Sequence, residues 1–206
     1  MKSKKFVLEG LALLAIAGLL ALTSCKNDSV PEQGTSVQEE TWLQEQKKEL
    51  EGKTEGTHTI TAPSYLTEGG LVKIRKLLDG ANVPVDLDLS QATGLTYIAT
   101  DTFIECFTLQ SVKLPSSVTE IGKYAFQSCT RLTSVTILRG VTTIGAHAFQ
   151  SCSKLTKVTF QKTDGWHTKN SYDEAESPES IDASKPSTNA EKLRGGDWVS
   201  KYLIRK

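Results

Sequence analysis

Two overlapping stretches of this 206-residue sequence repeat one pattern: LQSVKLPSSVTEIGKYAFQSCTRLTSVTI (residues 109–137) and LTSVTILRGVTTIGAHAFQSCSKLTKVTF (residues 132–160). The second copy starts 23 residues after the first, and the same step aligns several further columns of apolar residues. A unit of this length cannot bury its apolar face alone, so its recurrence predicts a solenoid of stacked coils. The columns are Ile98, Ile121 and Ile144; Phe103, Phe126 and Phe149; Cys106, Cys129 and Cys152; Leu109, Leu132 and Leu155; and Val112, Val135 and Val158.

Each copy contains the signals of one complete coil. Leu132, Val135 and Ile137 are spaced like the inward residues of a strand, and Val141 to Gly145 resembles a second short extended segment. Ala148-Phe149 then begins a tight, helical corner. We therefore expect an α+β solenoid with a period of about 23 residues, in which the strands of successive coils stack in parallel.

The repeat resembles the BspA-type leucine-rich repeat, whose typical unit reads L-x-x-V-x-I-P-x-x-V-x-x-I-G-x-x-A-F-x-x-C. A weaker copy with Leu95 and Ile98 precedes the two good ones, and Leu87 and Leu89 supply its strand. Two departures, Thr102 in place of alanine and 138–140 in place of the proline turn, make the turns irregular. The resemblance implies a bacterial surface protein, some members binding host matrix proteins, epithelial cells or other bacteria. It provides no ligand-binding motif that could be transferred by residue.

Residues 1–24 have the layout of a secretory signal peptide, with lysines at 2, 4 and 5 before an apolar run. Leu22-Thr23-Ser24-Cys25 resembles the lipobox of bacterial lipoproteins. That resemblance implies cleavage before Cys25, lipidation of its thiol and an anchor in the outer membrane, with the protein exposed at the cell surface. Ordinary secretion with an incidental Cys25 is the alternative.

The rest of the chain divides by composition around the repeats at 95–160. Residues 25–56 predict a flexible, partly helical tether, with a partner-binding helix through Trp42 as the alternative. Residues 57–94 predict an N-terminal cap with a helix over 67–80 and the first strand. Residues 161–206 predict a C-terminal cap that contains a strand, preceded by an acidic loop at 163–186 that wraps without packing.

The cysteine column raises a choice between thiols, a disulfide and a metal site. Adjacent Cα atoms would lie about 4.8 Å apart, within disulfide range, but parallel inward side chains disfavour the required dihedral. A linear ladder also does not provide the converging ligands that zinc needs, and His147 lies in a corner that we expect to be exposed. We expect Cys106, Cys129 and Cys152 to be buried, reduced and structural, like the phenylalanines of the column Phe103, Phe126 and Phe149.

The outward positions of the strands are the candidate ligand-binding residues. They are polar and hydrogen-bonding, as a protein-binding face requires, although any solvated sheet face has this composition. Aromatic anchors are the second kind of candidate, because such residues dominate binding energy at many interfaces; Trp166 is one of them. The other candidates are Ser111, Lys113, Ser134, Thr136, Lys157, Thr159, Tyr97 and Tyr124.

Catalysis and nucleic-acid binding have little support. The histidines at 58, 147 and 167 have no nucleophile beside them by motif, and Asp86, Asp88 and Asp101 lack the spacing of an EF-hand. Basic and acidic side chains are equal at 24 each, so no basic surface is indicated. We expect a monomeric binding protein without enzymatic activity, metal or cofactor, which adheres to a host or bacterial protein. The alternative is a structural or assembly lipoprotein that faces the periplasm.

Overall fold

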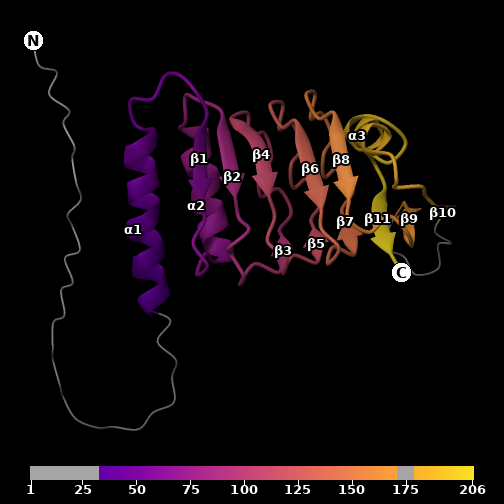
Figure 1. The fold of residues 1–206 in the computed structure, drawn as a ribbon, viewed down its shortest axis with the longest axis horizontal. Coiled ribbons are helices and arrows are strands. Elements are labelled where there is room, and N and C mark those ends of the chain that lie inside the picture. The colour runs from indigo at the N-terminus through magenta and orange to yellow at the C-terminus, as the bar shows by residue number, and fades with distance from the viewer. Residues whose placement is uncertain (1–32, 171–178) are drawn as a thin grey trace, which may run out of the picture. The chain divides into compact units, whose positions relative to one another are not determined.

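The computed structural model describes residues 33–170 and 179–206, all within one compact unit. The signal peptide predicted at 1–24 and the lipidation site at Cys25 lie outside the described residues. Five parallel strands form one sheet, called sheet A, in the order β1-β2-β4-β6-β8 (Figure 1). These strands are β1 (His58–Thr61), β2 (Val85–Asp88), β4 (Leu109–Lys113), β6 (Ser134–Ile137) and β8 (Lys157–Phe160).

The register of sheet A matches the repeat in the sequence. Ser134 pairs with Lys157 and Val135 with Val158, each 23 residues further along the chain. Because the same residue type occupies the same position in successive coils, the alternation of inward and outward side chains is kept across the sheet. The parallel sheet thus fits the predicted solenoid-like repeat.

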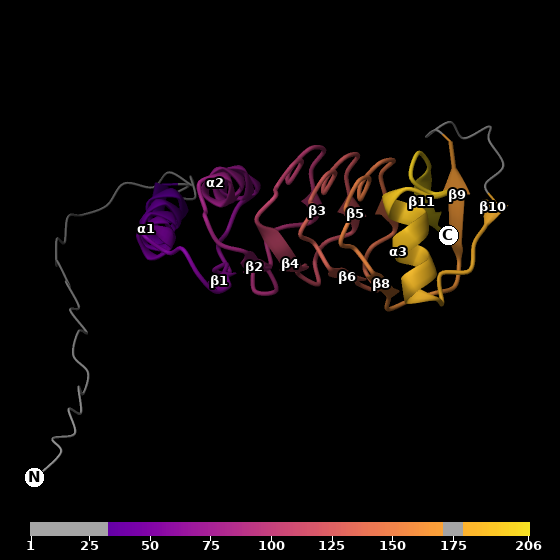
Figure 2. The same ribbon diagram turned by 90° about the horizontal axis from the view of Figure 1, so that it is seen from above.

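The second sheet, sheet B, runs along the other side of the coils (Figure 2). Its three repeat strands, β3 (Tyr97–Ile98), β5 (Glu120–Ile121) and β7 (Thr143–Ile144), pair in parallel. Beyond β7 the pairing becomes antiparallel and continues through β11, β9 and β10. These three are β11 (Tyr202–Arg205), β9 (Trp166–Lys169) and β10 (Glu179–Ser180).

The corners between the sheets use left-handed backbone at two positions per coil. The first column is Asp101, Tyr124 and His147, and the second is Glu105, Ser128 and Ser151, all with φ between 56° and 60°. Non-glycine residues rarely adopt this conformation. Here amide hydrogen bonds to the next coil hold it, as from Tyr124 N to Ala146 O (3.1 Å) and from Ser128 N to Gln150 O (2.8 Å).

The interior of the repeats is filled by the predicted columns. Phe126 stacks on Phe103 and on Phe149, with ring centroids 5.3 Å apart in both pairs. The three rings and the isoleucine column are fully buried. Offset aromatic stacking at this spacing adds to the stabilisation from burial, so the phenylalanine column ties each corner to the next.

A close approach of neighbouring backbones explains the glycines of the repeat. A Cβ atom on Gly122 would lie 2.6 Å from the Thr100 nitrogen, and one on Gly145 would clash with the backbone of Lys123. The equivalent residue of the first copy is Ala99, which is exposed because β3 is the edge strand of sheet B. Alanine therefore fits at this position only in the first coil, where no preceding coil packs against sheet B.

Helix α2 (Glu68–Asp79) lies at the N-terminal end of the repeats, and its first turn is capped by Thr67, whose side chain accepts from Gly70 N. Its apolar face is buried, as the spacing of Leu71, Ile74 and Leu78 predicts. Two hydrogen bonds join it to the next coil, from Arg75 Nε to Ile104 O (3.0 Å) and from Thr108 Oγ1 to Leu78 O (2.8 Å).

Residues 33–50, part of the region interpreted as a tether, form helix α1 (Gln33–Leu50), which packs on α2. Leu43 and Leu50 are buried in the same core as the repeats. The Glu39 carboxylate, 3% exposed, accepts from the backbone N of Thr67 (2.8 Å) and from its hydroxyl (2.9 Å). These buried contacts fix α1 against the domain.

Helix α3 (Pro186–Arg194) and the tail continue the hydrogen bonding of the last coil. His147 N donates to Val199 O (2.6 Å), and Ser151 N donates to Arg194 O (2.9 Å). In the earlier coils the equivalent amides donate to carbonyls of the next coil. The buried Asn189 amide donates to Val158 O (3.1 Å) on the edge strand of sheet A. The tail thus supplies acceptors to two corner amides of the last coil and a donor to the edge strand of sheet A.

Two expectations about the C-terminal region are wrong. The segment 163–186 does not simply wrap: it contains β9, and Ala183 is buried in the core. Trp166, expected to be an exposed anchor, is 1% exposed, because its ring packs edge-on against Phe160 at 5.0 Å. A third expectation, about a corner of the repeats, is also wrong: His147 is half-buried rather than exposed, with its ring stacked on Tyr124.

Candidate protein-binding face

The outward side of sheet A gathers six of the nine predicted ligand-binding residues. The register places Ser111, Ser134 and Lys157 in one row across β4, β6 and β8. A second row carries Lys113 on β4, followed by Thr136 paired with Thr159. The side chains of both rows are exposed or half-buried, and the valines between them point inward. We call these two rows the polar face.

The polar face continues onto strands β1 and β2, which the sequence interpretation did not include. Asp86 pairs with Thr59 on one side and Ser111 on the other, and Asp88 pairs with Thr61 and Lys113. The alternation of apolar residues at 85, 87 and 89 would have placed both aspartates on this side.

One ion pair and one hydrogen bond to a carboxylate lie within the polar face. Ser111 Oγ donates to Asp86 Oδ1 (2.5 Å), and Lys113 Nζ lies 2.9 Å from Asp88 Oδ2. Burial alone would raise the pKa of Asp88, but hydrogen bonds from Ser90 and Lys113 outweigh it and leave the pKa below its usual value. The hydrogen bond to Asp88 in turn raises the pKa of Lys113. Both groups are therefore charged near neutral pH, and they hold each other in place.

The two tyrosine candidates lie away from the polar face. Tyr97 belongs to β3 in sheet B, and its hydroxyl donates to the Glu68 carboxylate, a bond that raises the pKa of the tyrosine. Tyr124 lies in a corner, where its ring stacks on His147 at 5.0 Å and Lys123 Nζ lies 4.9 Å from the ring centroid. A partner on the polar face would therefore not use these rings as anchors.

The cysteine column is inaccessible to a ligand. Cys106, Cys129 and Cys152 are fully buried free thiols, and the latter two donate to the Phe103 and Phe126 carbonyls at 3.1 and 3.0 Å. Burial raises the pKa of Cys106 to about 11, and the neighbouring Cys152 thiol together with burial raises that of Cys129. Among residues 33–170 and 179–206, no group of three or more histidine, cysteine or acidic side chains could hold a metal ion.

Residues 88–191 match the family model described as the BspA type leucine-rich repeat region (6 copies). A crystal structure of a leucine rich cell surface protein from Faecalibacterium prausnitzii A2-165 is 29% identical, with a TM-score of 0.33. The match covers 41% of this chain and 26% of that protein, so this chain spans about a quarter of its length. No match was found among curated protein sequences. Within the described part of the chain, no helix combines the length and the apolar content needed to cross a bilayer. The family match extends over half of the sequence and includes every repeat strand after β2, and the chain belongs to the family of BspA-type leucine-rich repeat proteins.

Proposed function

We propose that this protein is a lipid-anchored binding protein of the bacterial cell envelope that contacts a protein partner through the polar face. The partner is a host matrix protein, a host cell-surface protein or a surface protein of another bacterium. One observation carries the proposal: six predicted contact residues from three coils lie side by side on one parallel sheet. The family supports a binding role, and the similar Faecalibacterium protein is described as a cell surface protein.

The composition of the polar face suits recognition of a polar protein surface. Hydroxyl groups at 111, 134, 136 and 159 offer donors and acceptors from a backbone that is already ordered. Preorganised contacts of this kind reduce the entropy lost on binding. Because the buried columns behind the sheet fix the strand spacing, the partner would meet a rigid array. The proposal needs no catalytic step.

The same proposal includes a cap at each end of the stack of repeats. On the N-terminal side, α2 would cover the first coil through its bonds from Arg75 and Thr108. On the C-terminal side, the tail would cover the last coil through the Val199 and Arg194 carbonyls. Terminal coils of repeat proteins require such covers to remain soluble.

Surface exposure is the first test of the proposed adhesion. Protease treatment of intact cells should remove the domain, as detected with an antibody against the repeats. A periplasmic marker must survive the same treatment. Complete protection of the domain would contradict adhesion and would favour the periplasm-facing alternative.

Lipidation at Cys25 is tested separately. Cells fed an alkyne-labelled fatty acid should incorporate the label into the wild-type protein, and Cys25→Ser should abolish it. The wild-type protein should also be found in the membrane fraction, because two or three acyl chains anchor a protein stably. A labelled Cys25→Ser protein would place the modification elsewhere and contradict this part of the proposal.

The polar face itself is tested by a matched pair of variants. Thr136→Arg places a bulky charge at the centre of the face, and Thr96→Arg makes the same change at an exposed position directly before β3 in sheet B. Binding to immobilised host matrix proteins and to epithelial cells should fall for Thr136→Arg and stay unchanged for Thr96→Arg. Equal effects of the two substitutions would contradict the assignment of the face.

A further inference from the structure

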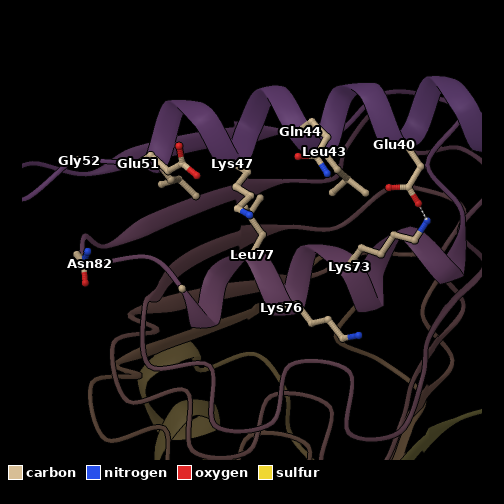
Figure 3. Close-up of a pocket in the computed structure, with 12 residues that line it drawn as sticks. Glu40, Leu43, Gln44, Lys47, Glu51, Gly52, Lys73, Lys76, Leu77 and Asn82 are labelled. Carbon is tan, nitrogen blue, oxygen red and sulfur yellow. Dashed lines mark hydrogen bonds and ion pairs between the residues drawn. The ribbon is translucent and has the colours of Figure 1, made fainter.

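A groove of about 490 Å³ lies between α1 and α2 (Figure 3), and none of its lining residues belongs to the polar face. Three leucines from the two helices, Leu43, Leu50 and Leu77, form its apolar part. Lysines at 47, 73 and 76 and glutamates at 40 and 51 form its polar walls. Figure 3 shows Lys47 extending from α1 toward Leu77 on α2.

The groove has a cause in the sequence of α1. Among residues 37–50 of this helix, the buried side chains are Glu39, Leu43 and Leu50, which lie on one face. The turn between Leu43 and Leu50 contributes the polar residues Gln46 and Lys47 to that side instead of a further apolar residue. Between Leu43 and Leu50, α1 therefore offers no apolar side chain to the space opposite Leu77.

The other end of the helix pair is closed tightly. A Cβ atom on Gly70 would lie 2.7 Å from the Glu39 carboxyl carbon, so the helices can approach here only because position 70 is glycine. Glu39 also holds the cap of α2 through Thr67. Because this end is fixed, the opening beside Lys47 and Leu77 does not depend on a loosely docked helix.

The charges of the groove favour an anion. Lys73 is engaged by Glu40 and lies 3.8 Å from Glu39, and the hydrogen bond that Lys73 donates to Glu40 raises the pKa of this lysine. Lys47 and Lys76, by contrast, have no ion-pair partner among the described residues. Figure 3 shows Lys76 extending from α2 away from α1, so Lys47, opposite Leu77, is the unpaired cation that faces the groove.

We propose that this groove binds a single-chain anionic amphiphile, namely an unbranched acyl carboxylate. The acyl chain would cover Leu43, Leu50 and Leu77, and the carboxylate would accept a charged hydrogen bond from Lys47. The volume lies within the range of about 300–1,000 Å³ typical of small-molecule sites. This binding activity goes beyond the proposed protein contact and uses none of the residues on the polar face.

The test is titration of the purified protein with decanoate, kept below its micelle concentration, followed by amide chemical shifts. Shifts should be confined to α1 and the C-terminal half of α2, with a dissociation constant on the order of 1 mM, as expected for so small a ligand. Lys47→Met removes the charge but keeps an apolar stem, and Lys47→Glu reverses the charge. Both should weaken binding about tenfold or more.

The matched control is Lys48→Glu, because Lys48 is the next residue of α1, is exposed and does not line the groove. It should bind decanoate as the wild type does. Equal binding of decyltrimethylammonium, or equal weakening by Lys48→Glu, would overturn the proposed carboxylate site. Sedimentation with anionic phospholipid vesicles in the absence of any decanoate response would also overturn it, in favour of a lipid surface.

Discussion

At the residue scale, the glycine column shows how stacking constrains individual positions. Gly122 and Gly145 both face the backbone of the preceding coil, whereas Ala99 faces none. The neighbour in each case is main chain, which cannot rotate away as a flexible side chain could. Glycine in this column therefore indicates that the backbone of the preceding coil lies in contact with that position.

Gly122→Ala should destabilise the protein by about 2–3 kcal/mol, because the added Cβ would lie 2.6 Å from Thr100 N and forces the coils apart. The control is Gly195→Ala, where nothing lies within 4 Å of the new atom. Urea unfolding followed by circular dichroism measures both. A Gly122→Ala protein as stable as the control would show that the coils can separate without cost.

His58 gives a pH dependence that can be measured. Its side chain is 6% exposed, and Lys53 Nζ lies 2.8 Å from Nδ1. Burial, and then the Lys53 charge, lower the pKa of His58, while Glu49 acts in the opposite direction. The folded protein therefore favours the neutral ring, compared with an unfolded pKa of about 6.5.

The stabilisation from neutral His58 is complete above pH ~6.5 and is lost as the pH falls from there toward the lower folded pKa. Wild type should consequently lose more stability between roughly pH 7 and pH 5 than His58→Gln, which cannot titrate there. Urea midpoints across this range give the comparison. Parallel pH profiles for the two proteins would contradict the role of His58.

At the element scale, each coil is joined to its neighbours by the same three devices. The strands pair in parallel, the phenylalanine rings stack, and the left-handed corner residues donate to the next coil. Threonines add a fourth device at the loops: Thr133 Oγ1 and Thr156 Oγ1 each lie 3.4 Å from the carbonyl 23 residues earlier. Residues that look like a solvated surface in the sequence thus also hold coils together.

The cysteine column belongs to this set of contacts, and its state can be counted. We expect three free thiols, at 106, 129 and 152, in unreduced, denatured protein that has been processed and lipidated at Cys25. The folded protein should react with none of them at neutral pH, because burial raises the pKa of Cys106 to about 11 and blocks access to all three. A count of one thiol in the denatured sample would mean a disulfide in place of the ladder.

At the scale of the whole molecule, α1 decides whether the region before the repeats is a spacer or part of the domain. Glu39, Leu43 and Leu50 bury one side of the helix against the rest of the unit. The polar face and the groove then lie on one folded body. A spacer helix would instead open independently of the repeats.

Trp42, half-buried on α1, can report on this directly, while Trp166 and Trp198 lie buried near the C-terminus. Unfolding followed by Trp42 fluorescence, with the other two tryptophans replaced by phenylalanine, should coincide with unfolding followed by circular dichroism. An earlier Trp42 transition would show that α1 opens before the repeats. Glu39→Gln, which weakens the bonds to Thr67, should bring that earlier transition about.

The sequence by itself determined the repeat, its inward columns and the outward positions of the later strands, because a step of 23 residues fixes what each coil presents. Only the tertiary structure decided the location and burial of residues that lie outside the regular repeat. Trp166 became a core residue because β9 joins sheet B, and Asp86 joined the polar face through pairing with Ser111. The helix at 33–50 was readable as a helix, but its docking depends on Gly70 and Thr67 nearly thirty residues away. Local periodicity records contacts that recur at a constant step, whereas contacts made once between distant segments leave no pattern in the sequence.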